Sequence, residues 1–328
     1  MTSIHRYVDL LLALLTFGAA SALAQPVPPD WPSKPVRVVI PYTAGSTSDL
    51  AFRPLAPLIE ARLGQRFVIE NKPGASGNIG AGEVARAAPN GYTFLLGAVG
   101  IFTANKHLVR SMNFDPLAAF DPVVLLSDAP TIIVVNAGLP VGSLRELAAH
   151  ARANPGKLNF SSPGIGTAPH LATELFASMV GAQMVHVPFG GSPPAVLALQ
   201  QGEVQMYFSI YGPVAGLLRS GAAKALAVSA AARLPILPEV PTTAESGFPE
   251  LLTGTWQAMV APRGTDARVL DRLNAEVRLA LTDPAVRKLY ADIGFEPGNL
   301  SRAELGAFMR NEAARWKKVI ETANVQAQ

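Results

Sequence analysis

Two loops of small polar residues carry the groups in this sequence that are best suited to chemistry. PYTAGSTSD (residues 41–49) follows the apolar run VRVVI, and SSPGIGTAPH (residues 161–170) follows LNF. Each loop runs into a segment whose apolar residues have helical spacing. Hydroxyl groups, free backbone N–H groups and the positive end of a helix dipole suit an anion of modest size, such as a carboxylate. If the two loops face each other across a cleft, they can hold both ends of a small acid.

The same loops also fit an ordinary structural role. A turn from a strand into a helix needs an N-cap, and Ser, Thr, Asp and Gly usually supply it. Neither loop contains G-x-G-x-x-G or G-x-x-x-x-G-K-[ST], so the sequence predicts no nucleotide site. The occurrence of two such loops favours binding, although the residues alone leave the structural interpretation open.

The sequence lacks the common catalytic and metal-binding patterns. His170 and Glu174 lie four residues apart on one expected helix face, but neither an H-E-x-x-H motif nor a cysteine accompanies them. The serine-nucleophile signatures G-x-S-x-G and S-x-x-K followed by S-D-N are also missing. We therefore expect no catalytic residue, no metal and no cofactor, with a hydrolase as the weaker alternative.

Composition and charge narrow the class of protein further. The 328-residue chain is 49% hydrophobic and 16% charged, which predicts a substantial buried core. The length suffices for one large domain or two of ordinary size. The net charge is only +3 and no dense run of Lys and Arg occurs, so no nucleic-acid partner is expected.

Residues 1–24 have the pattern of a secretory signal peptide. Arg6 precedes the apolar stretch LLLALLTFGAASALA (residues 10–24), and Ala22 and Ala24 fit the small-x-small rule for cleavage. We expect cleavage after Ala24, with an uncleaved membrane anchor as the alternative. The chain contains no cysteine and therefore no disulfide. Export without disulfides points to a bacterial periplasm, where we expect a soluble protein.

The elements that must position the two loops alternate between strands and helices. The patterns predict a strand at 36–42, a helix over 49–64, a strand and turn at 66–74, and a helix followed by a strand over 77–99. A similar order begins again at residue 158. This alternation predicts mainly parallel sheets with helices on both faces. Helix starts are predicted at Ser143, Asp266, Asp283 and Ser301.

Two long strand-like passages divide the chain into lobes. FDPVVLLSDAPTIIVVNA (residues 120–137) and TWQAMVAP (residues 255–262) could each carry the chain from one lobe to the other. We predict a first lobe of residues 25–125 and 250–328, with a second lobe of residues 126–249 inserted in it. The predicted fold class is α/β, with two Rossmann-like domains joined by crossover strands around a ligand cleft.

Motifs along nearly the whole chain after residue 24 carry a resemblance to a known family. They are PYTAGSTSD, VIENKPGASGNIGAGEVARAAPNGYTFLLG, SSPGIGTAPHLATELF, VPFGGSPPAVLALQQGEVQMYF, LPEVPTTAESGFPELLTGTWQAMVAP and LNAEV. In order and spacing the sequence resembles the periplasmic substrate-binding proteins of tripartite tricarboxylate transporters, the Bug or TctC-like family. The resemblance implies a two-lobed periplasmic-binding-protein fold of type II-like architecture that closes on its ligand.

The resemblance also implies a function and partners. The ligand would be a small carboxylic acid, held mainly by backbone amides, hydroxyls and ordered waters. The protein would act as a monomer and deliver the acid to TctA- and TctB-like membrane subunits. A role as the ligand-sensing partner of a periplasmic sensor kinase is the alternative, because it would use the same fold and pocket.

Ligand-binding positions follow from the resemblance, residue by residue. In the first lobe they are Tyr42, Thr43, Ala44, Ser46, Thr47, Asp49, Asn78, Gly97 and Ala98. In the second lobe they are Ser161, Ser162, Gly166, Thr167, His170, Phe189, Gly190 and Ser209.

Three of these positions have open interpretations. Capping is favoured for Asp49, because a carboxylate beside an anionic ligand would repel it. His170 could shape the second loop, touch the ligand or only pack. Ser209 stands where many relatives carry an aspartate, so a ligand with an ammonium group would lose a counter-ion there.

Overall fold

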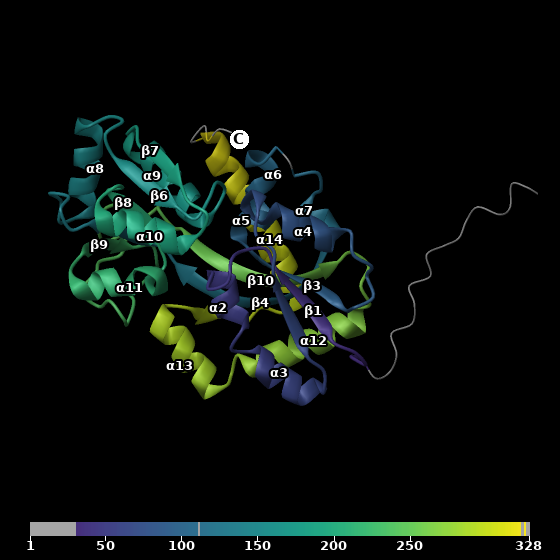
Figure 1. Cartoon of the computed structure of the whole chain (residues 1–328). Helices are drawn as coiled ribbons and strands as arrows, with labels where there is room; N and C mark the ends of the chain where they lie inside the picture. Colours follow the sequence, from purple (N-terminus) through teal and green to yellow (C-terminus); the bar gives the residue numbers. More distant parts are fainter. Residues whose placement is uncertain (1–30, 111, 323–324, 326–328) are drawn as a thin grey trace, which may run out of the picture.

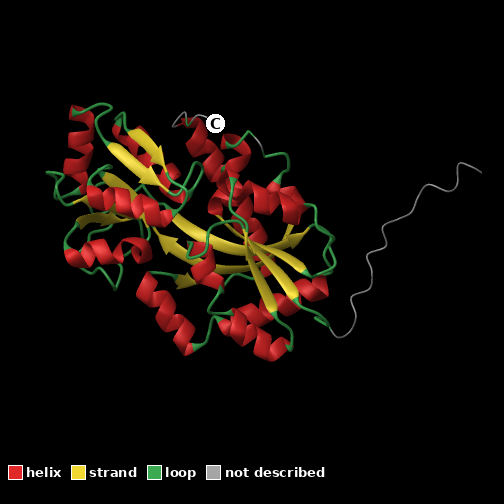
Figure 2. Ribbon diagram, viewed as in Figure 1, coloured by secondary structure: helices red, strands yellow, loops and turns green. Residues whose placement is uncertain are grey.

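Two β-sheets organise the part of the chain that the structure describes, residues 31–110, 112–322 and 325 of a computed structural model (Figures 1 and 2). The strand order is β11-β4-β10-β3-β1-β2 in the first sheet and β7-β6-β8-β5-β9 in the second. We call the parts built on these sheets the first and second lobes. The second lobe carries the teal elements on the left of Figure 1. The predicted signal peptide and its cleavage site lie outside the described residues.

The first sheet is mixed rather than mainly parallel as predicted, because two of its five strand pairings are parallel and three are antiparallel. β1 pairs in parallel with β2 and β3, β10 runs antiparallel to β3 and β4, and β11 runs antiparallel to β4. β4 therefore points the same way as β1. The strands are β1 (Val36–Ile40), β2 (Phe67–Asn71), β3 (Thr93–Ala98), β4 (Phe120–Pro130), β10 (Gly254–Pro262) and β11 (Glu296–Pro297).

The second sheet repeats this design. β6 pairs in parallel with β7 and β8, and β5 lies antiparallel between β8 and β9. Each sheet has one internal strand that is antiparallel to both neighbours, β10 in the first sheet and β5 in the second. This strand is the first that the chain forms after it crosses from the other lobe. The strands are β5 (Ile132–Asn136), β6 (Asn159–Ser162), β7 (Val185–Pro188), β8 (Met206–Ser209) and β9 (Ala223–Val228).

The chain crosses between the lobes where the two long passages were predicted. Residues 120–137 form β4 in the first sheet and β5 in the second, with Thr131 between them. β10 brings the chain back and pairs with β4 from Gly254 opposite Pro130 to Pro262 opposite Phe120. The two crossings therefore lie side by side, so the chain connects the lobes at one place in the fold.

Helices cover both faces of the first sheet. Side chains of Val38 and Ile40 join a core with α2, α3, α12 and α13, whereas Val39 joins a second core with α4, α5 and α14. Burial on both faces explains the nearly continuous apolar run of the parallel strands. The helices of this lobe are α2 (Thr47–Phe52), α3 (Ala56–Leu63), η1 (Ala75–Gly77), α4 (Asn78–Ala85), α5 (Val99–Thr103), α6 (Asn105–Leu108), α7 (Pro116–Ala119), α12 (Ala267–Ala280), α13 (Pro284–Ile293) and α14 (Arg302–Thr322).

The second sheet is also covered on both faces. Ile133 and Val135 join one core with α8 (Leu144–Ala153) and α9 (Ala168–Val180). Ile132 and Val134 join the other core, with α10 (Ser192–Gln201) and α11 (Tyr211–Ser220). Within the described ranges, no helix is long and apolar enough to cross a membrane.

The four predicted helix starts are confirmed, whereas one predicted helix is interrupted in the structure. Side chains at all four predicted starts accept backbone N–H bonds, namely Ser143, Asp266, Asp283 and Ser301. The single helix predicted over 49–64 is wrong, because the chain forms α2 and α3 with a break at Pro54. Proline has no N–H to continue the helical bonds and clashes with the preceding turn. Leu55 N–H bonds instead to the carbonyl of Phe52 at 2.9 Å.

The break leaves the carbonyl of Ala51 without its helical partner, and Tyr290 supplies another. The Tyr290 hydroxyl donates to Ala51 O at 2.5 Å, and the Tyr290 side chain is fully buried. This bond joins α13 to α2, the short helix that follows the first polar loop. α13 thus supports the loop from behind.

We predict that Tyr290→Phe lowers the free energy of unfolding by about 1–3 kcal/mol, because a buried carbonyl loses its donor. Chemical denaturation measures the change. Tyr92→Phe is the matched control, since the Tyr92 hydroxyl bonds to Ser33 in exposed contacts, and it should cost less than about 0.5 kcal/mol. Equal losses in both variants would contradict the role given to Tyr290.

Candidate functional site

A cavity of about 330 Å³ lies between the two lobes. The first lobe contributes the loop of residues 41–46, here called the first loop, and the turn of residues 73–77. The second lobe contributes residues 163–165 and 167 of the loop between β6 and α9, here called the second loop, and residues 188–192. Thr131 and Thr255 line the cavity from the two chain crossings. The volume suits a small metabolite.

The cavity walls are uncharged. Among the described residues that line it, none is Asp, Glu, Lys, Arg or His. Both apolar side chains, such as Ile165 and Phe189, and hydroxyl groups line it. The hydroxyl residues are Tyr42, Thr43, Ser46, Thr47, Ser76, Thr131, Thr167, Ser192, Tyr207, Ser209 and Thr255. A polar ligand in this cavity would therefore meet neutral donors and acceptors rather than ions.

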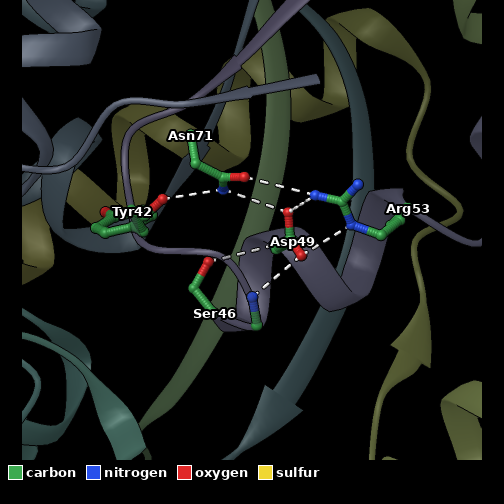
Figure 3. Close-up of polar contacts among 6 residues, drawn as sticks. Tyr42, Ser46, Asp49, Arg53 and Asn71 are labelled. Atoms are coloured by element: carbon green, nitrogen blue, oxygen red, sulfur yellow. Dashed lines mark hydrogen bonds and ion pairs between the residues drawn. The ribbon is translucent and has the colours of Figure 1, made fainter. Parts of the chain in front are cut away.

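Asp49 holds the first loop from behind (Figure 3). One carboxylate oxygen accepts from Gly45 N–H at 3.1 Å and from Arg53 Nε at 3.0 Å. The other accepts from Arg53 Nη2 at 2.6 Å and from Asn71 Nδ2 at 3.3 Å. Burial alone would raise the pKa of Asp49, but these bonds outweigh it and hold that pKa below its usual value. Asp49 is 4% exposed and does not line the cavity.

Further bonds link the same network to the cavity wall. Asn71 Nδ2 also donates to the carbonyl of Tyr42 at 3.0 Å, and Ser46 Oγ caps α2 by accepting from Asp49 N–H at 3.4 Å. Tyr42 and Ser46 both line the cavity. The Asp49 carboxylate therefore shapes the first loop from outside the cavity, while the N-cap of α2 is Ser46.

The second loop is held by hydroxyl groups and two histidines. Thr167 Oγ1 donates to Gly164 O at 2.6 Å, and Gly164 N–H donates to Ser162 Oγ at 3.1 Å. Ser162 Oγ lies 2.6 Å from Nε2 of His186 on β7. Gly166 N–H donates to Nδ1 of His170 on α9 at 3.1 Å. The second loop therefore lines the cavity and is hydrogen-bonded to His170, and the preceding Ser162 contacts His186. Neither imidazole lines the cavity.

Both imidazoles are kept neutral by their surroundings. The rings stack with centroids 4.0 Å apart, and His186 also stacks on Phe160 at 4.9 Å. Burial, aided by the neighbouring His186, lowers the pKa of His170 to about 3, and burial lowers the pKa of His186 to about 4. Glu174 Oε1 lies 3.7 Å from His170 Nε2, and burial raises the pKa of Glu174.

Few other ionisable groups approach the pair. Of the elements packed against α9, β6 and β10 carry no ionisable side chain, and β8 carries only the buried Tyr207. α14 shares an apolar cluster with α9 through Trp316 and Ile320. The ionisable residues of α14 flanking these two are Arg315, which is partly exposed and lies over the Trp316 ring, and Lys317, Lys318 and Glu321, which are exposed.

The structure gathers about half of the predicted site residues around the cavity. Those that line it are Tyr42, Thr43, Ser46, Thr47, Ala98, Thr167, Phe189, Gly190 and Ser209. The rest lie behind or beside its walls: Ala44, Asp49, Asn78, Gly97, Ser161, Ser162, Gly166 and His170. Gly97, for example, packs so closely on Phe102 that a Cβ would lie 2.6 Å from the ring.

Two predicted site residues, Asn78 and Ser209, have a buried side-chain atom with no hydrogen-bond partner among the described residues, and of these two Ser209 lines the cavity. Its side chain is 2% exposed, and its Oγ has no hydrogen-bond partner among the described residues. Buried hydroxyls are normally bonded, so such an exception needs an explanation. A ligand in the cavity would supply the missing partner.

The turn of residues 73–77 was missed by the sequence reasoning, which named only Asn78 beside it. Ala75 and Ser76 have positive φ angles of 46° and 54°, a conformation uncommon for residues other than glycine. Strained backbone of this kind is concentrated at functional sites. The segment KPGASG does follow a strand with small residues, as the two recognised loops do, and that resemblance was the available signal.

Two α/β lobes of matching strand order around an inter-lobe cavity define a two-lobed solute-binding protein. Solved structures share this architecture. R. palustris Rpa4515 with adipate aligns at a TM-score of 0.86 and 36% identity, over 91% of this chain and 100% of that one. MatC (Rpa3494) from Rhodopseudomonas palustris with bound malate aligns at 0.83 and 31%, over 88% and 100%. The predicted fold class is confirmed.

The sequence comparisons identify the family. The family described as "Tripartite tricarboxylate transporter family receptor", TctC, matches residues 51–325. BugT of Bordetella pertussis is 34% identical over 313 residues, covering 95% of this chain and 96% of BugT. The chain belongs to this TctC family of solute-binding proteins, which confirms the resemblance seen in its motifs.

We predict that Asp49→Asn lowers the free energy of unfolding by about 1–2 kcal/mol, since charge-assisted bonds behind the first loop are weakened. The loss is limited because Arg53 is half exposed and water screens its charge. Asp292→Asn, in the exposed pair of Lys288 and Asp292, is the matched control and should change it by less than about 0.5 kcal/mol. Equal losses would show that Asp49 has no special role.

We predict that the histidine pair makes stability depend on pH between about 4 and 6.5. The pKa values of His170 and His186 are about 3 and about 4 in the folded protein, against about 6.5 when unfolded. The unfolded chain therefore binds more protons in this window, so their contribution to stability is complete above pH 6.5 and is lost as the pH falls. Each histidine contributes a slope of up to about 1.4 kcal/mol per pH unit.

Denaturation at several pH values tests this prediction. His170→Asn should flatten the dependence between about pH 4.5 and 6 relative to the natural protein. Glu174, with its raised pKa, acts in the opposite sense, and both proteins retain it. An unchanged slope would contradict the burial of a neutral His170.

Proposed function

We propose that this chain is a periplasmic solute-binding protein that captures a small carboxylate-bearing metabolite between its lobes. It would deliver that acid to a membrane transporter of the tripartite tricarboxylate type. The observation that carries the proposal is a cavity walled by both lobes with neutral hydroxyl and backbone groups. The relatives solved with adipate and with malate support an acid as the ligand.

The carboxylate would be held by residues of both lobes. In our proposal, Tyr42, Thr43, Ser46 and Thr47 offer hydroxyl and backbone groups on one side, and the second loop faces them. Ordered waters can complete such a site with little enthalpic loss. Asp49 and His170 would shape the two loops rather than touch the acid.

The absence of charge in the walls bears on the choice of acid. An ammonium group on the ligand would lose its hydration without meeting a carboxylate among the described lining residues. Acids without an ammonium group should therefore bind better than the matching amino acids. Among the described lining residues, the ionisable side chains are Tyr42 and Tyr207, and burial raises the pKa of each hydroxyl further from neutrality. Neither is therefore suited to acid–base catalysis near neutral pH, which supports binding without chemistry.

The proposed domain organisation follows the two crossings. Residues 25–125 and 250–328 would move as one lobe and residues 126–249 as the other, after removal of residues 1–24 in the periplasm. The hinge would lie at Thr131 and at residues 253–255, where both crossings meet. Closure would shift the population toward a ligand-favoured state. The protein would work as a monomer.

A thermal-shift panel tests the proposal on protein refolded from denaturant, which removes any ligand carried through purification. Adipate, malate, their diamides and 2-aminoadipate are compared. Adipate or malate should stabilise the fold by about 2.7 kcal/mol at a hundredfold excess over Kd, the diamides should have no effect, and 2-aminoadipate should act more weakly than adipate. Equal shifts with acid and amide, or no shift with a wider set of acids, would refute the carboxylate site.

A further inference from the structure

The second loop reaches across the cleft and touches the first lobe through glycine. A Cβ atom on Gly100 of α5 would lie 2.5 Å from the carbonyl oxygen of Gly166. A Cβ on Gly166 itself would lie 2.6 Å from Oδ1 of Asn105 on α6. The lobes can approach this closely only because both residues lack a side chain. Gly166 is therefore a contact point between the lobes as well as part of the loop.

Asn105 extends this contact to the cavity wall. Its Nδ2 donates to Ser76 O at 2.9 Å and to Asn78 Oδ1 at 2.8 Å. Ser76 lines the cavity within the strained turn of residues 73–77. The position of Gly166 is thus coupled by direct contacts to both sides of the cavity.

The orientation of Gly166 depends on His170. The peptide N–H of Gly166 donates to His170 Nδ1 at 3.1 Å, so Nδ1 carries no proton and the ring proton resides on Nε2. His170 is 4% exposed, which leaves water little access to replace this bond. The ring is fixed in turn by its stack on His186, and His186 meets Ser162 at the start of the loop.

We propose that His170 and His186 are positioning residues for ligand capture, because the stacked pair fixes both ends of the second loop in the shape that lines the cavity. His170 sets the end that meets the first lobe, and His186 sets the end that leaves β6. Neither imidazole touches the cavity, so both act through the loop. The effect on ligand affinity rests on the proposed function, whereas the positioning of the loop does not.

The test compares two substitutions of His170 in the whole protein without ligand. In His170→Asn, the side-chain oxygen can take the place of Nδ1 and accept from Gly166. In His170→Phe, the ring can still stack but no acceptor remains. His150→Asn on α8 is the matched control. Amide exchange of Gly166 and the ¹⁵N signals of the imidazoles are followed by NMR.

The expected result separates bonding from packing. Gly166 N–H should exchange about tenfold faster in His170→Phe, the change expected from losing one buried hydrogen bond. It should stay within about threefold of the natural protein in His170→Asn and in the control. The ¹⁵N spectrum should show His170 with its proton on Nε2. A proton on Nδ1, or unchanged exchange in His170→Phe, would overturn the proposal, and the spectrum of the natural protein decides if that variant does not fold.

Affinity for adipate then tests the link to capture. Binding should weaken about tenfold in His170→Phe and stay within about threefold in His170→Asn, by the same loss of one bond. Equal affinity in both variants would refute a role in capture. If the natural protein does not bind adipate, the proposed function is weakened for this acid, and the exchange data still decide whether the histidines position the loop.

Discussion

The first sheet is completed only by a strand that the chain forms after it has built the second lobe. β10 inserts between β3 and β4 and pairs antiparallel with both, so the core of the first lobe depends on residues 254–262. Because β10 lies beside β4, both connections between the lobes are at the same place in the fold. Thr131 N–H donates to Thr253 O at 3.0 Å, and Ser229 N–H donates to Thr131 O at 2.7 Å. The cavity is built on this junction, because Thr131 and Thr255 line it. The first and second loops line the same cavity as Thr131 and Thr255, so the junction of the crossings sets how the two loops lie relative to each other.

The described residues that line the cavity carry no charged side chain, and the nearest charged groups of the first loop, Asp49 and Arg53, lie behind that loop. Asp49 and Arg53 support the first loop, and the neutral pair of His170 and His186 supports the second. Loops made of glycine, serine and threonine have little rigidity of their own, since glycine loses much conformational entropy on ordering. The groups behind them supply that rigidity, while the cavity keeps backbone and hydroxyl groups free for a ligand. Residues that do not line the cavity can therefore set its shape.

Local patterns in the sequence predicted those features that depend on neighbours along the chain. Helix caps such as Ser143 and Asp283 act within one turn, and the two crossings are long strand-like passages without the residues of a hairpin turn. The break at Pro54 was also local and could have been read from the missing N–H. The features that could not be predicted from the sequence depend on how strands that are distant in the chain pair with each other. His170 and His186 meet because β6 and β7 pair in parallel, and nothing in the spacing of these residues indicates it. The positive φ angles of Ala75 and Ser76 likewise have no signature in residue type.

An uncharged cavity also has an evolutionary consequence. In a pocket that binds through ion pairs, replacing one partner leaves a buried charge uncompensated, and such changes cost several kcal/mol, so two substitutions must arrive together. Where the walls are hydroxyls, backbone groups and small apolar side chains, a single exchange alters the shape or one hydrogen bond and leaves a folded protein. Each intermediate on the way to a new specificity can then be viable. Structures that share this fold and carry adipate in one case and malate in another show that the scaffold has diversified among acids.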